Sequence, residues 1–275
     1  MRYRINFSIR QLLRKHYVKL SKTSIQSNLQ NLLYKNISIS KEQIEILLSK
    51  SKIPSRLLNL KEVNFYPEKN FGVNYKPIKI KFNGRNPDFA EFIGEMLGDG
   101  NIYRNTVRIT INSQEQDFKK HIMKLFEKLF GVKPKIYLSK KTKAIQIYVY
   151  SKKLRILLEK HGLGQGNKVT RNIKVPKWIK NNKTFSKYCI RGMIDTDGCV
   201  FYHKRDKQLY ISFHNYASNL LMDLQKMAKH FNLKFVRNNI YTVTLYKKLD
   251  VNNYIREIGF SNEKHISKVN KYLGL

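Results

Sequence analysis

A helix-like segment that ends in Asp-Gly occurs twice in this chain of 275 residues, and this duplication restricts the fold more than any other feature. The first copy, FIGEMLGDG, ends at Gly100, and the second, IRGMIDTDG, ends at Gly198. The segments that follow also resemble each other: IYVYSKKLRILLEKHGLGQGNK starts at residue 147, and VTLYKKLDVNNYIREIGFSNEKH starts at residue 243. We therefore expect two copies of one structural unit.

Each unit is expected to contain a helix ending in Asp-Gly, two strands, a helix, two strands and a closing helix. The strands alternate apolar and polar residues, which is typical of a sheet with one buried face. The apolar members include Val107, Ile109 and Ile111 in the first unit and Leu209, Ile211 and Phe213 in the second. The middle helices are predicted at about residues 116–130 and 217–231.

The two units follow a different N-terminal part. Residues 1–60 are predicted to be a basic helical region, for which a helix-turn-helix reader is one interpretation. The prolines and the Asn83-Gly84 turn within 61–86 indicate an extended connector. The predicted first repeat spans 87–168, a linker spans 169–182, and the second repeat spans 183–275.

The charge of the chain restricts its partners. Lys and Arg number 54 against 19 Asp and Glu, a formal net charge of +35, so a polyanion such as nucleic acid is the expected partner. Apolar runs are too short to cross a membrane. Cys189 and Cys199 have neither zinc-binding nor disulfide-framework spacing, which favours an intracellular protein, cytoplasmic or nucleoid-associated. An organellar location is the alternative, because residues 1–40 contain Arg but no Asp or Glu.

The two motif helices are predicted to pack side by side. Asn86-Pro87 is a typical helix start, with Asn as the N-cap and Pro at the first helical position. Small residues four apart allow two helix backbones to touch: Gly94 and Gly98 in the first helix, and Gly192 and Thr196 in the second. Gly100 and Gly198 are expected to end the helices in the left-handed conformation.

This packing would bring Asp99 and Asp197 together at the negative ends of both helix dipoles. Two carboxylates about 4 Å apart repel by about 4 kcal/mol at an effective dielectric constant of 20. Divalent cations would compensate, and metals held beside a phosphate are a recurrent means of cutting phosphodiesters. The pattern therefore predicts a metal-dependent phosphodiester site.

The paired motifs resemble those of the LAGLIDADG homing endonucleases, in the single-chain form with two repeats. The resemblance covers about residues 87–275 and includes VPKWI at 175–179. It implies an α+β fold of two pseudosymmetric αββαββα units whose antiparallel sheets form a saddle over DNA. It also implies a monomeric homing endonuclease that uses Mg²⁺ or Mn²⁺ to cut both strands of a long, asymmetric DNA target, as in intron homing.

The resemblance also assigns residues. Asp99 and Asp197 would be the catalytic, metal-binding acids, with Gly98 and Thr196 as further metal positions. Basic residues after the closing helices would assist catalysis: Lys168, and Lys264 or His265. Polar residues near the metals would be Asn112, and His214 or Asn215. The polar sheet faces predict the DNA contacts, which are Arg108, Thr110, Gln146, Tyr148, Tyr150, Lys204, Arg205, Tyr210, Ser212, Thr242 and Thr244.

Glu95 departs from the family pattern, because an apolar residue is usual at this interface position. A buried acid there needs a partner, and Arg191 is the residue we expect. Two alternative functions stay open: a DNA-binding regulator that has lost cleavage, and an intron maturase that binds intron RNA. The presence of both Asp99 and Asp197 favours the endonuclease over the regulator, but the sequence does not separate the endonuclease from the maturase.

Overall fold

The computed structural model describes residues 2–3, 39–40, 78–139 and 142–274. Residues Pro77–Leu275 form one compact unit and Met1–Lys76 another. In the N-terminal unit the described elements are β1 (Arg2–Tyr3) and β2 (Ile39–Ser40), which pair antiparallel. The rest of the helical region predicted for 1–60, and the connector up to residue 77, lie outside the described residues.

The larger unit contains the predicted repeat. The first copy consists of α4 (Pro87–Leu97), β3 (Gly100–Tyr103), β4 (Thr106–Asn112), α5 (Gln116–Phe130), β5 (Lys135–Leu138), β6 (Ala144–Tyr150) and α6 (Lys152–Lys160). The second consists of α8 (Lys183–Asp197), β7 (Gly198–His203), β8 (Gln208–His214), α9 (Ser218–Ala228), β9 (Val236–Asn239), β10 (Thr242–Leu245) and α10 (Lys248–Glu257). A short helix, α7 (Lys177–Lys180), lies between them.

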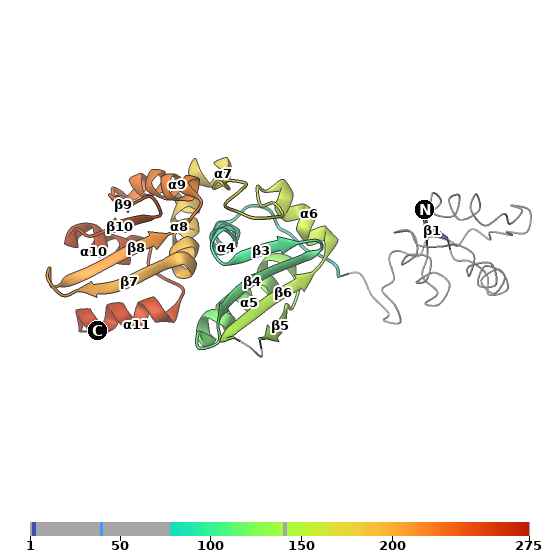
Figure 1. Ribbon diagram of the computed structural model, residues 1–275, viewed down its shortest axis with the longest axis horizontal. Helices are drawn as coiled ribbons and strands as arrows, with labels where there is room; N and C mark the ends of the chain where they lie inside the picture. Colours follow the sequence, from blue (N-terminus) through green and yellow to red (C-terminus); the bar gives the residue numbers. More distant parts are fainter. Residues whose placement is uncertain (1, 4–38, 41–77, 140–141, 275) are drawn as a thin grey trace, which may run out of the picture. The chain divides into compact units, whose positions relative to one another are not determined.

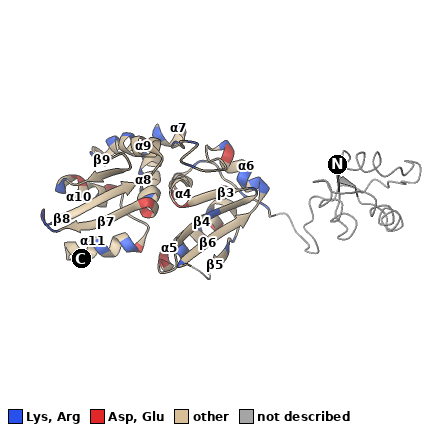
Figure 2. Cartoon of the chain, in the orientation of Figure 1, with Lys and Arg blue, Asp and Glu red and all other residues tan. Residues whose placement is uncertain are grey.

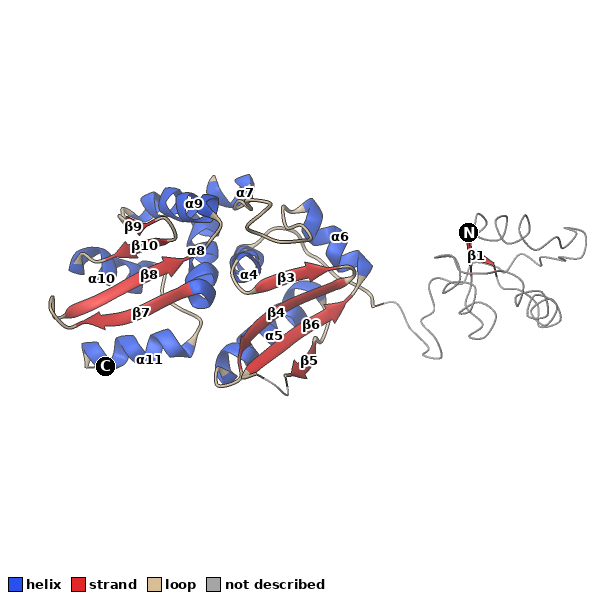
Figure 3. Cartoon of the chain, viewed as in Figure 1, coloured by secondary structure: helices blue, strands red, loops and turns tan. Residues whose placement is uncertain are grey.

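Each copy forms a four-stranded antiparallel sheet with the same strand order, β3-β4-β6-β5 in the first and β7-β8-β10-β9 in the second. Burial alternates along the strands, so that Ile109 and Ile211 are fully buried while Arg108 and Tyr210 lie on the opposite face. Helices α4 and α8 lie side by side between the two sheets (Figures 1 and 3). The predicted fold of two αββαββα units is thus confirmed.

The start of each central helix follows from its cap. Asn86 Oδ1 accepts a hydrogen bond from the Phe89 backbone N–H at 2.8 Å, as predicted, and Asn182 Oδ1 does the same for Phe185 at 2.9 Å. Every residue from Phe89 to Leu97 is buried, so α4 packs on all sides rather than along one stripe. It is therefore a core helix, between its own sheet and α8.

The glycines of the motif helices allow close backbone contact. A Cβ on Gly94 would lie 2.3 Å from the Cys189 carbonyl oxygen, and one on Gly192 would lie 2.4 Å from that of Glu91. The prediction that Gly100 and Gly198 end the helices in a left-handed conformation is wrong, because neither has a positive φ. A Cβ on Gly198 would instead lie 2.3 Å from the Ile194 carbonyl oxygen, so glycine is required there because a side chain would not fit.

Three details differ from the prediction. The helix expected at 217–231 divides into α9 and a 3₁₀ turn, Lys229–Phe231. A further helix, α11 (Glu263–Leu273), follows α10, and Asn262 caps it through a bond from the Lys264 N–H. The end of the connector packs on the first repeat, where the Phe82 ring lies 4.7 Å from that of Phe89. Among the described helices, none is long and apolar enough to cross a membrane.

Candidate active site

The two acids of the repeated motif lie at the adjoining ends of α4 and α8. Asp197 is the last residue of α8, and Asp99 lies between α4 and β3. The Asp197 carboxyl carbon is 3.4 Å from the position that a Cβ on Gly98 would occupy, so this carboxylate lies against the end of the partner helix. The two repeats thus bring their acids to one place.

Both acids are half-buried, and their pKa values reflect it. Burial and repulsion from Asp197 raise the pKa of Asp99 to about 6, although the positive charges of Lys264 and Lys168 act to lower it. Burial also raises the pKa of Asp197, against Lys168 and a hydrogen bond from Asn215. A raised pKa means that the folded protein disfavours the charged form of each acid. Additional positive charge at this place would therefore be stabilising.

Two lysines lie beside the acids. Lys168 Nζ donates to the carbonyl oxygen of Leu97 at 2.9 Å and to that of Gly98, so it caps the C-terminal end of α4. Burial lowers its pKa, while Asp197 and Asp99 act in the opposite direction. Lys264, in the first turn of α11, forms an ion pair with Glu115 Oε1 at 3.2 Å. The sequence did not single out Glu115, because nothing local indicates that the start of α5 meets α11.

The structure separates the alternatives that the sequence left open. Asn215 Nδ2 donates to Asp197 Oδ2 at 2.7 Å, whereas His214, whose Nδ1 lies 3.0 Å from Thr242 Oγ1 on the exposed sheet face, acts on Asp197 only electrostatically. Lys264 acts electrostatically on both acids, whereas His265 is buried. Asn112, at the end of β4, accepts a bond from the Gln114 backbone N–H at 3.0 Å.

Gly98 and Thr196, the further positions suggested for a metal, offer different groups. The Gly98 carbonyl oxygen already accepts from Lys168. The Thr196 hydroxyl donates within its own helix, to the Gly192 carbonyl oxygen at 2.9 Å. Since that hydroxyl is buried and already hydrogen-bonded within α8, the Thr196 side chain is poorly placed to act as a metal ligand.

The predicted DNA-contacting residues lie on the polar faces of the two sheets, with one exception. Arg108, Thr110, Gln146, Tyr148 and Tyr150 are partly or well exposed on the first sheet, as are Tyr210, Ser212 and Thr242 on the second and Lys204 and Arg205 in its β7–β8 turn. Thr244 is only 2% exposed, so its selection as a DNA contact was wrong: alternation indicates the face of a strand but not what covers it. Lys and Arg also mark the β7–β8 turn and α11 (Figure 2).

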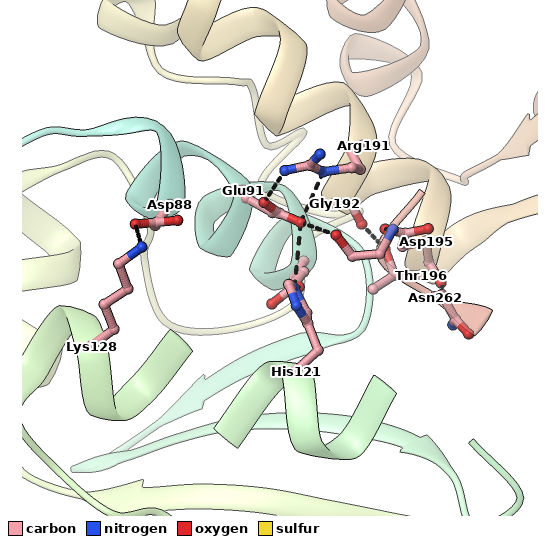
Figure 4. A network of polar contacts seen from close by, with 11 residues as sticks. Asp88, Glu91, His121, Lys128, Arg191, Gly192, Asp195, Thr196 and Asn262 are labelled. Atoms are coloured by element: carbon pink, nitrogen blue, oxygen red, sulfur yellow. Dashed lines mark hydrogen bonds and ion pairs between the residues drawn. The ribbon is translucent and has the colours of Figure 1, made fainter. Parts of the chain in front are cut away.

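The predicted pairing of Glu95 with Arg191 is also wrong. Arg191 forms a two-pronged ion pair with Glu91, Nε to Oε1 at 3.0 Å and Nη2 to Oε2 at 2.6 Å (Figure 4). Glu95 instead contacts His121 of α5, with 3.0 Å between Oε1 and Nε2. Glu91 and Glu95 are one turn apart on α4, and only the packing of α8 and α5 decides which partner each receives.

The pKa values in this cluster follow from its contacts. Burial raises the pKa of Glu91, but hydrogen bonds with His121 and Arg191 outweigh it and lower the value to about 2. Burial raises the pKa of Glu95 to about 7, although His121 opposes it. Burial alone would lower the pKa of His121, but the contacts with Glu91 and Glu95 raise it to about 10.

The donor set between the motif acids fits a hard divalent cation. It offers carboxylate oxygens with raised pKa values, and within the described part of the chain no side chain or backbone group donates a hydrogen bond to the Asp99 carboxylate. Mg²⁺ and Mn²⁺ prefer oxygen ligands, and beside a phosphate they keep coordination positions open for water and phosphate oxygens.

Comparison with known proteins agrees with the motif and the fold. Residues 184–271 match the family model of the LAGLIDADG-like domain. The second repeat is such a domain, and the first repeat has the same order of elements and the same sheet topology. Residues 184–271 of the chain therefore form a LAGLIDADG-like domain, and the first repeat shares its topology.

Similar proteins include the replication factor C small subunit of Methanocaldococcus jannaschii, which is 27% identical over 221 residues, 76% of this chain and 12% of that protein. The chain thus spans about an eighth of the length of that relative. Among solved structures, variants of the homing endonuclease I-DmoI are 21% identical with a TM-score of 0.42, covering 63% of this chain and 95% of theirs. The N-terminal LAGLIDADG domain of DUF199/WhiA is 13% identical with a TM-score of 0.44, covering 65% of this chain and 86% of its own.

Proposed function

We propose that the chain is a site-specific endonuclease that hydrolyses both strands of double-stranded DNA and requires Mg²⁺ or Mn²⁺. The observation that carries the proposal is the meeting of Asp99 and Asp197 at the ends of two abutting helices, with Lys168 and Lys264 close enough to act on the pKa of Asp99. Two acids that repel each other and lie beside cations are suited to a phosphodiester and its metal ions.

The side chains around the acids have separate tasks in this proposal. The bound cations would activate the attacking water and neutralise charge on the phosphate. Asn215 orients Asp197 through its 2.7 Å hydrogen bond. Lys168, fixed by the carbonyl oxygens of α4, supplies a positive charge in a water-poor position, where it stabilises the charge that develops on the phosphate. Lys264, held by Glu115, is a second such group.

DNA would lie against the polar faces of the two sheets. Tyr, Gln, Thr and Arg side chains there can contact base edges, and Lys204 and Arg205 of the β7–β8 turn can contact phosphates. The net charge of +35 supports a polyanionic partner. We propose that the repeats, 87–168 and 183–275, each read one half of an asymmetric target. A monomer suffices, because one chain supplies both acids.

The proposal is tested with Asp99→Asn and Asp197→Asn and a DNA target selected from a random library for binding. We expect the unchanged protein to cut both strands in the presence of Mg²⁺, and both variants to bind the target with unchanged affinity while losing double-strand cleavage. Asp117→Asn is the matched control, since Asp117 is exposed on α5 and pairs with the exposed Lys120.

The outcomes separate the alternative functions. Sequence-specific DNA binding without cleavage by the unchanged protein would favour the regulator. Tighter binding of intron RNA than of any selected DNA would favour the maturase. Full cleavage by both variants would exclude Asp99 and Asp197 as catalytic residues.

A further inference from the structure

A second group of metal-ligating side chains lies away from the motif acids. Glu91 and Glu95 of α4 and His121 of α5 each offer one ligand atom, and these atoms all lie within 4.8 Å of one another. Glu91 and His121 are seen at the centre of Figure 4, with Arg191 opposite. The proposed endonuclease chemistry does not use this group.

Among the described residues, one oxygen of this group has no partner. Glu95 is 0% exposed, and its Oε1 contacts His121, while no hydrogen bond from the described part of the chain reaches its buried Oε2. A buried, unpaired carboxylate oxygen costs free energy of folding. A protonated His121 does not remove this cost. Its single Nε2–H lies between Glu95 Oε1 at 3.0 Å and Glu91 Oε1 at 3.3 Å, so it does not reach Glu95 Oε2.

A divalent cation in the place of that proton would satisfy more atoms. It can bind His121 Nε2, Glu91 Oε1 and both oxygens of Glu95 at once. Tetrahedral ligands about 2.1 Å from a cation are about 3.4 Å apart, close to the two spacings in the cluster. We propose that Glu91, Glu95 and His121 form a structural site for a transition-metal cation of the Zn²⁺ class.

The donor set indicates the class of metal. One imidazole with two carboxylates suits Zn²⁺ or Mn²⁺, whereas Mg²⁺ and Ca²⁺ prefer oxygen ligands alone. The His121 side chain is 26% exposed, whereas those of Glu91 and Glu95 are 2% and 0% exposed, so the cation enters beside His121. Binding releases the Nε2 proton of His121 to solvent, so the charge of the site rises by one.

The second repeat orients the ligands of the first. Arg191 of α8 holds Glu91 through two bonds, and the Ser261 hydroxyl donates to Glu91 Oε1 at 2.5 Å. Such outer partners fix the direction of a metal ligand and contribute about 10-fold to 100-fold in metal affinity. The cation would therefore strengthen the contact of α4 with α5 and, through Glu91, the contact between the two repeats.

The test uses the full chain carrying Asp99→Asn and Asp197→Asn, so that the proposed active site cannot hold the metal. After removal of metals with a chelator, Zn²⁺ alone is titrated by calorimetry. We expect one Zn²⁺ per chain, a melting temperature that rises with Zn²⁺ concentration, and an affinity at least 10-fold weaker in His121→Gln and in Glu95→Gln.

Two controls keep the result interpretable. Glu127→Gln on the exposed side of α5 and His230→Gln on the surface should bind Zn²⁺ as the parent does. Glu95→Gln should fold without metal, because it removes a buried charge, and at equal Zn²⁺ concentration its melting temperature should rise less than that of the parent.

Absence of Zn²⁺ binding by the parent, or a Zn²⁺ affinity of Glu95→Gln and His121→Gln equal to that of the parent, would overturn the site. Neither result depends on DNA cleavage. Failure of this inference is thus distinguishable from failure of the proposed endonuclease function.

Discussion

The contact between α4 and α8 depends on glycine, and Gly192→Ala tests it. The added Cβ would lie 2.4 Å from the Glu91 carbonyl oxygen and 2.9 Å from the Glu95 backbone nitrogen. Both are backbone atoms, so no change of rotamer relieves the contact. Ordinary van der Waals contact begins near 3.4 Å, and α4 must therefore retreat by roughly 1 Å from α8.

Two opposing effects decide the magnitude. Replacing Gly by Ala inside a helix stabilises it by about 1 kcal/mol through helix propensity. Overpacking a rigid interior costs about 1–3 kcal/mol, and here it also opens gaps between α4 and the buried face of α8. We expect overpacking to win by about 1–2 kcal/mol, which lowers the melting temperature by about 2–8 °C. A displacement of about 1 Å at the paired acids should also reduce DNA cleavage about 100-fold.

Thermal unfolding followed by circular dichroism measures the first effect, and cleavage of the selected target measures the second. Lys124→Gly compared with Lys124→Ala gives the helix-propensity contribution alone, because Lys124 is exposed in the middle of α5. A higher melting temperature for Gly192→Ala than for the unchanged protein would refute the reasoning, since it would mean that the helices are not in backbone contact.

Three further predictions concern charge. Glu91→Gln leaves Arg191 without its ion-pair partner and should destabilise the protein by about 3 kcal/mol in urea unfolding, whereas Glu127→Gln should have little effect. Burial, with Lys264 and Lys268 nearby, lowers the pKa of His265 from 6.5 to about 3, so the unfolded chain binds a proton that the folded protein does not. The contribution of His265 to stability should therefore fall by about 2 kcal/mol from pH 7 to pH 5, so the difference in unfolding free energy between the unchanged protein and His265→Gln should shift by that amount over this range, whereas the difference from His230→Gln should stay constant. DNA affinity should drop by about 10³-fold to 10⁵-fold between 50 and 200 mM salt, as for about 6–10 phosphate contacts, and a flat response would contradict binding along the sheets.

Much of the fold was predictable because its signals are local. Helix caps such as Asn86 act within one turn, and alternation along a strand reports which face is buried, so neither depends on distant residues. The helix α11 was missed although Asn262 is a cap, because the repeat comparison ended near its first turn. Thr244 was misjudged because the neighbours that cover a sheet face come from other segments.

The sequence by itself determined that two similar helices each end in an acid and that two half-buried sheets accompany them. Periodicity and caps depend on residues close together in the chain, and the duplication is visible by comparing the two copies. Only the tertiary structure decided the partners: Arg191 with Glu91, Glu95 with His121, and Asn215 rather than His214 with Asp197. It also decided why the glycines are needed, which is close contact and not a left-handed turn. The physical reason is that pairing depends on which faces of separate helices meet, and residues one turn apart on α4 face different neighbours.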